Sequence, residues 1–158
     1  MADEKMQLTR VLSASPAEVF EAWTNPEILS RWFAPGEMSA EVAELDARPG
    51  GTYRVAMHHP NGATHVVHGS YREVKPNESL VFTWAWEGVE MPDTEVSVEL
   101  RPHGGDTELV LTHEGFPVAE LRDQHIHGWT GSLEKLAAAL ERSRRHEGRM
   151  PGMFSRMQ

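Results

Sequence analysis

The sequence predicts an α+β domain in which a curved, seven-stranded antiparallel sheet wraps around one long C-terminal helix. Seven short segments alternate apolar and polar residues and are separated by turn-forming residues, which is typical of strands. One later segment, residues 118–145, instead places its apolar residues three and four positions apart, as an amphipathic helix does. Strands joined by short turns pair antiparallel, and only this helix is long enough to cover an apolar sheet face. Together the two patterns predict the fold.

The seven predicted strands follow one another along most of the chain. They are residues 5–13, 38–45, 52–58, 65–74, 80–87, 95–101 and 107–114. Alternation is clearest in the sixth, where Val96, Val98 and Leu100 should point inward. Residues 60–62 (Pro-Asn-Gly) are a strong hairpin signal between the third and fourth strands. So wide a sheet need not be filled by side chains, and a cavity can remain beside the helix.

Two short helices are predicted between the first two strands. Ser15 followed by Pro16 is a helix start, and Glu18 completes a capping box with Ser15. Asn25 and Pro26 end this helix and begin the second one. Helices inserted at this point interrupt the sheet and can plug one end of it.

The long C-terminal helix has a clear period of 3.6 residues. Its apolar stripe consists of Ile126, Trp129, Leu133, Leu136, Ala137 and Leu140. Gly128 and Gly131 each weaken a helix by roughly 1 kcal/mol relative to alanine, so its N-terminal half is the weaker one. Residues 148–152 (Gly-Arg-Met-Pro-Gly) predict the end of the helix. We therefore expect one domain over residues 1–146 and a flexible, basic tail over residues 147–158.

Composition excludes several function classes. The 158-residue chain contains no cysteine, which excludes disulfides, thiolate nucleophiles and cysteine-based metal sites. Its formal net charge of −9 argues against nucleic acid as a partner of the domain. No apolar run resembles a signal peptide or a membrane span, so a cytoplasmic location is predicted.

Aromatic side chains gather on the side of the sheet that we expect to be concave. We interpret them as the wall of a pocket for an apolar or aromatic ligand, held by stacking and by indole N–H groups. The predicted ligand-binding set is Trp32, Phe33, Tyr53, Val55, Met57, Phe82, Trp84, Trp86, His113, His125 and Trp129. The alternative is that these residues form an ordinary packed core.

Two histidines belong to this set for different reasons. His113 is in phase with Leu109 and Leu111 and should point inward, whereas His125 lies on the edge of the helix stripe. Either imidazole could anchor a ligand or carry a proton at the mouth of the cavity. The alternative is a half-buried histidine with a structural hydrogen bond.

Motifs for metals and cofactors are absent from the sequence. None of the nine histidines has the spacing of a chelating pair, and no HExxH motif occurs. Neither a glycine-rich nucleotide loop nor the GxSxG turn of hydrolases is present. We therefore expect no metal and no cofactor, and a binding protein rather than an enzyme.

The order and spacing of several short motifs resemble one known family. They are Arg10-x-x-x-Ala14-x-Pro16-x-x-Val19-Phe20-x-Ala22-Trp23-Thr24, Trp32-Phe33, Arg48-x-Gly50-Gly51-x-Tyr53, Gly69-x-Tyr71-x-Glu73, Leu80-Val81-Phe82-Thr83, Leu109-x-Leu111-Thr112-His113 and Gly128-Trp129. With these motifs the sequence resembles the Activator of Heat shock protein 90 ATPase homologue-like family. That family belongs to the START/SRPBCC superfamily, whose fold is the Bet v 1-like helix grip.

The resemblance implies three functions. Members of the superfamily bind hydrophobic small molecules or lipids, act as polyketide cyclases, or serve as co-chaperones. We therefore expect a hydrophobic small molecule as the partner, with a chaperone and a link to stress response as the alternative. A cyclase-like enzyme using His113 or His125 is the third alternative. The edge strand 38–45 could also pair with a second copy to form a homodimer.

Overall fold

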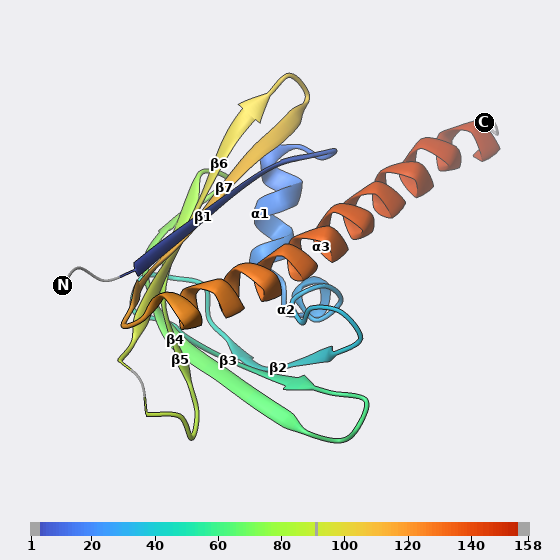
Figure 1. The fold of residues 1–158 in the computed structure, drawn as a ribbon. Coiled ribbons are helices and arrows are strands. Elements are labelled where there is room, and N and C mark those ends of the chain that lie inside the picture. Colours follow the sequence, from blue (N-terminus) through green and yellow to red (C-terminus); the bar gives the residue numbers. More distant parts are fainter. Residues whose placement is uncertain (1–3, 91, 155–158) are drawn as a thin grey trace.

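The computed structural model describes residues 4–90 and 92–154 and confirms the predicted architecture (Figure 1). The strands are β1 (Glu4–Leu12), β2 (Ser39–Leu45), β3 (Thr52–His58), β4 (Thr64–Lys75), β5 (Ser79–Trp86), β6 (Thr94–His103) and β7 (Asp106–Phe116). The helices are α1 (Pro16–Thr24), α2 (Pro26–Leu29) and α3 (Ala119–Phe154). Each predicted strand begins and ends within two residues of the observed one.

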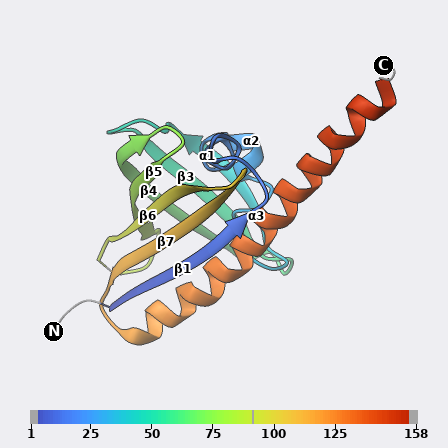
Figure 2. The same ribbon diagram turned by 90° about the horizontal axis from the view of Figure 1, so that it is seen from above.

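All seven strands form one antiparallel sheet in the order β1-β7-β6-β5-β4-β3-β2. The sheet curls around α3, and both views place this helix along β1 (Figures 1 and 2). The strands β1 and β2 are the two edges of the sheet. The β2 edge that we predicted as a dimer contact is therefore available for pairing, and the homodimer stays a prediction.

The stripe of α3 packs against the sheet as the 3.6-residue period requires. Trp129, Leu133, Leu136 and Leu140 are each at most 8% exposed. The predicted end of the helix is wrong, because α3 continues through residues 148–152 to its last residue. A single proline removes one hydrogen bond from the ladder, which weakens a helix without necessarily ending it.

Residues 155–158 of the predicted tail lie outside the described residues, and the flexibility of the tail stays a prediction. The part of α3 beyond the sheet extends away from the rest of the domain (Figure 1).

The capping box at the start of α1 is confirmed. The Glu18 N–H donates to the Ser15 hydroxyl at 3.2 Å, and the Ser15 N–H donates to the Glu18 carboxylate at 2.9 Å. Val19, Ala22 and Trp23 form the buried face of this helix. Together with α2 it fills the concave space at one end of the sheet (Figure 1).

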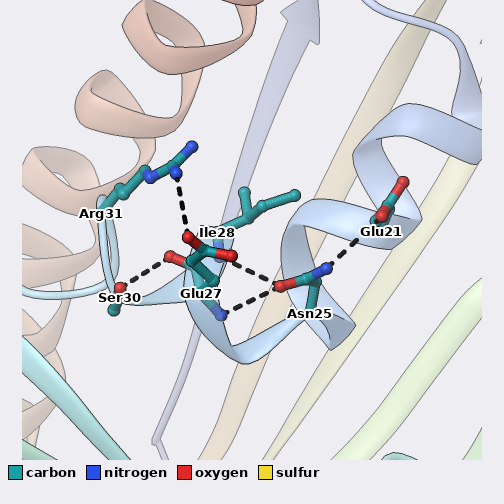
Figure 3. Close-up of polar contacts among 6 residues, drawn as sticks. All are labelled: Glu21, Asn25, Glu27, Ile28, Ser30 and Arg31. Carbon is teal, nitrogen blue, oxygen red and sulfur yellow. Dashed lines mark hydrogen bonds and ion pairs between the residues drawn. The ribbon is translucent and has the colours of Figure 1, made fainter.

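Asn25 fixes the corner between α1 and α2 (Figure 3). Its side-chain carbonyl accepts hydrogen bonds from the N–H groups of Glu27 (2.9 Å) and Ile28 (3.3 Å), as an N-cap does. The Ser30 hydroxyl donates to the carbonyl of Glu27 at 2.7 Å, and Arg31 forms an ion pair with the Glu27 carboxylate at 3.6 Å. The chain continues from α2 into residues 33–38, which form one wall of the pocket described below.

Gly69 of β4 lies directly against the backbone of β5. A Cβ atom on Gly69 would overlap the carbonyl oxygen of Thr83. That carbonyl accepts a hydrogen bond from the Tyr53 hydroxyl at 2.6 Å, and the Thr83 hydroxyl accepts one from the Ser70 N–H at 2.9 Å. Only glycine fits here without moving this bonded backbone.

We predict that Gly69→Ala destabilises the fold, because the added methyl group has to displace the bonded carbonyl of Thr83. The expected loss is about 3 kcal/mol in the free energy of unfolding, at the upper end for overpacked sites. Urea unfolding measures it. Gly105→Ala is the matched control, because a Cβ there meets no atom within 4 Å. Equal stability of the two variants would contradict this account of the contact between Gly69 and Thr83.

Candidate functional site

A pocket of about 470 Å³ lies between α3, the β3–β4 hairpin, β5 and residues 33–38. Its lining residues are Phe33, Pro35, Met38, Met57, His59, Thr64, His65, Trp84, Trp86, Glu87, Val89, Gln124, His125, Gly128, Trp129 and Ser132. Buried residues form one end, and we call this end the floor. Exposed residues, among them His65, Val89 and Gln124, form the other end, which we call the rim.

Aromatic rings form most of the floor. Phe33, Trp84 and Trp129 are each at most 4% exposed, and their ring centroids lie 5.1 to 5.9 Å apart. Met57 of β3 is buried beside them. Trp86 continues this surface towards the rim, with its ring centroid 5.5 Å from that of Trp84. The floor therefore offers a ligand apolar and aromatic contacts.

Polar side chains of α3 hold residues 33–38 against the helix. The Ser132 hydroxyl donates to the carbonyl of Phe33 at 2.7 Å. The Lys135 ammonium donates to the carbonyls of Ala34 (2.5 Å) and Met38 (3.0 Å). Partial burial lowers the pKa of Lys135. These bonds satisfy carbonyl groups of an irregular segment and fix the position of the pocket wall that it forms.

This contact explains one of the two glycines that weaken α3, Gly131. A Cβ atom on Gly131 would lie 3.0 Å from Cβ of Pro35, closer than packed side chains normally come. At Gly128 the nearest atom, Cγ of Pro35, is 4.0 Å away. Glycine at position 131 lowers the helix propensity of α3 but allows residues 33–38 to approach the helix closely.

His113 is a buried member of a chain of hydrogen bonds. The Trp129 indole N–H donates to Nδ1 of His113 at 3.0 Å, so the imidazole proton is on Nε2. Nε2 then donates to the hydroxyl of Thr94 at 2.7 Å, and this hydroxyl donates to the carbonyl of Trp84 at 3.2 Å. Burial, and secondarily the nearby His125, lower the pKa of His113 to about 2. The residue is therefore a neutral structural link between α3 and the sheet.

His125 is fixed in the same way at the pocket wall. Its Nδ1 donates to the carbonyl of Leu121 at 2.8 Å, and its Nε2 accepts the indole N–H of Trp86 at 3.0 Å. Burial lowers its pKa, while the bond to Leu121 acts in the opposite direction. Both ring nitrogens of His113 and of His125 are engaged in hydrogen bonds. Neither ring therefore has a free nitrogen that could exchange a proton with a substrate. This geometry does not favour the cyclase-like alternative.

Six of the eleven predicted site residues line the pocket: Phe33, Met57, Trp84, Trp86, His125 and Trp129. The other five, Trp32, Tyr53, Val55, Phe82 and His113, lie in the packed core. Alternation along a strand predicts to which face of the sheet a side chain points. It does not predict which helix or loop packs on that part of the face. Trp23 of α1 covers this region, with its ring centroid 6.4 Å from that of Phe82.

Sequence reasoning missed most of the rim. The predicted ligand-binding set does not contain His59 and His65. Met57 pairs with His65 across β3 and β4, and His59 is two residues beyond Met57, so all three share one sheet face. Met57 was predicted to face inward. Side chains alternate between the two faces of a strand, so this period and the hairpin turn together predict that both histidines lie at the pocket.

The described residues contain neither a cluster of metal ligands nor a membrane-spanning helix. Within residues 4–90 and 92–142, no three His, Cys, Asp or Glu side chains are arranged to hold a metal ion. Over the same residues, no helix combines the length and apolar character needed to cross a membrane.

The family is decided by a match of residues 13–141 to the family model of Activator of Hsp90 ATPase homolog 1-like proteins. The chain belongs to this family. A solved structure of a Chromobacterium violaceum protein is 33% identical, with a TM-score of 0.82, and the match covers 87% of this chain and 96% of that one. The AHSA1 protein of Silicibacter pomeroyi is 27% identical, with a TM-score of 0.81 and coverage of 89% and 99%. No curated protein matches the chain.

His113 and His125 should make the stability of this family member depend on pH. Their pKa values are lowered in the folded state, so the unfolded chain binds more protons at these two positions below pH 6.5, and stability falls as the pH falls. For one such histidine the loss is about 1.4 kcal/mol per pH unit below its unfolded pKa of about 6.5. Urea unfolding between pH 5 and pH 7 measures this slope. His113→Gln should make it shallower, whereas the exposed control His127→Gln should keep the wild-type slope. Equal slopes in the two variants would exclude His113 as the source.

Proposed function

We propose that this protein binds an apolar or aromatic small molecule in the pocket beside α3. The observation that carries the proposal is the floor built from Phe33, Met57, Trp84, Trp86 and Trp129. A volume of about 470 Å³ suits a small organic molecule, since ligand sites usually measure about 300–1,000 Å³. Burial of a ligand's apolar surface against these side chains supplies the binding free energy.

Three polar side chains of the pocket wall, His125, Ser132 and Glu87, are already engaged, which supports binding rather than catalysis at these positions. Towards the floor, His125 and Ser132 already have hydrogen-bond partners. The carboxylate of Glu87 is held by Arg54 through two bonds of 2.7 and 3.0 Å. An acid–base catalyst needs a group free to exchange a proton with a substrate, and these groups are engaged.

The family description also names activation of a chaperone ATPase. The geometry of the described residues supplies no argument for a chaperone comparable to the one for the pocket. Binding of an Hsp90-type protein therefore stays a prediction, and an ATPase assay with the bacterial chaperone and this protein tests it.

Filling the pocket should abolish binding without unfolding the protein. Gly128 lies on the pocket wall, and a side chain there has space beside Pro35. We expect Gly128→Leu to weaken binding of the neutral, apolar fluorophore N-phenyl-1-naphthylamine at least tenfold. Helix stability should rise, by roughly 1 kcal/mol. Fluorescence titration measures the affinity, and thermal unfolding measures the stability.

The adjacent substitution His127→Leu is the matched control, because this residue is exposed and does not line the pocket. It should leave the affinity for the fluorophore unchanged. If wild-type protein fails to bind the fluorophore, or if both variants bind it as wild type does, the pocket is not the binding site.

A further inference from the structure

The rim of the pocket contains two histidines whose rings pack edge to face. The ring centroids of His59 and His65 are 5.0 Å apart, at an interplanar angle of 81°. Both residues line the pocket, and His59 follows the end of β3 while His65 belongs to β4. The hairpin thus brings two imidazoles together on the face that carries Met57.

These two rings and the Gln124 amide form no hydrogen bond, in contrast to most polar side chains of the wall. Thr64 is bonded to His58, and His125, Ser132 and Glu87 are bonded as described above. Among the described residues, the side chains of His59, His65 and Gln124 form no hydrogen bond or ion pair. Their N–H donors are therefore free to bind a ligand at the rim.

The charges around the rim favour an anionic group over a cationic one. The only carboxylate on the wall is that of Glu87, and its charge is already compensated by Arg54. The free groups are two imidazoles and one amide. Imidazole N–H groups donate to a carboxylate, and a protonated imidazole adds charge to that bond. A cation would meet no free negative partner.

The rings also define a path from the rim to the floor. The centroid of Trp86 is 6.3 Å from that of His65 and 5.5 Å from that of Trp84. A ligand whose head lies beside the two histidines can therefore lay its body along Trp86 onto the aromatic floor.

We propose that the ligand is a monocarboxylic acid with an alkyl or aryl body, whose carboxylate is bound by His59 and His65 with Gln124 beside them. This inference rests on the proposed function, because it names the chemical class that the same pocket takes. It assigns the rim histidines to ligand selection and leaves the aromatic floor to supply most of the affinity.

Three ligands with the same ten-carbon chain separate the head group from the body: decanoate, 1-decanol and decylammonium. Each is titrated against bound N-phenyl-1-naphthylamine in buffer with EDTA, which removes metal ions that could bridge to histidine. Decanoate should bind about tenfold more tightly than decanol, as charge-assisted hydrogen bonds allow. Decylammonium should bind more weakly than either.

The double variant His59→Ala, His65→Ala should lower the affinity for decanoate to that of decanol and leave decanol unchanged. His103→Ala is the control, since this exposed histidine lies at the β6–β7 turn and does not line the pocket. Circular dichroism verifies that each variant is folded. Equal binding of decanoate and decanol, or an unaffected double variant, overturns the inference while the proposed function stands. Failure of the fluorophore and all three ligands to bind overturns both.

Discussion

The contacts of Trp129 hold the long helix, the sheet and the pocket in one arrangement. Its ring stacks on Trp23 of α1 at 5.9 Å and lies 5.1 Å from Trp84 of β5 and 5.8 Å from Phe33. Its indole N–H donates to His113 of β7. This one side chain thus contacts every layer of the domain. Its ring packs against other aromatic rings, and its single N–H group forms a hydrogen bond. The position of α3 along the sheet, and hence the shape of the pocket floor, depends on this contact.

The two tryptophans that contact Trp129, Trp23 and Trp84, each have an indole N–H without a hydrogen-bond partner. An unsatisfied buried donor costs about 1–3 kcal/mol. At Trp84 the cost falls on the pocket floor, where the ring is surrounded by Phe33, Trp86 and Trp129. Tryptophan at this position provides a large flat surface at the expense of stability, in keeping with the proposed ligand site.

The fold could be predicted from the sequence because its signals are local. Alternation of apolar residues defined each strand, and the spacing from Trp129 to Leu140 defined the buried stripe of α3. The boundary of the pocket depends on which element covers which part of the concave face, and no local pattern contains that information. Phe82 and Trp84 lie on the same face of β5, yet α1 covers the first, and the second lines the pocket. The end of α3 was also mispredicted, because a proline weakens a helix without defining where it stops.

We propose that the aromatic pocket beside α3 holds a small molecule. The most direct test uses protein purified from its own host. Native mass spectrometry of the intact protein measures whether a molecule is retained, and extraction identifies it. The account predicts a single retained apolar molecule in the wild-type protein and none in Gly128→Leu. Retention of the same molecule by both proteins would place it outside the pocket and contradict the account.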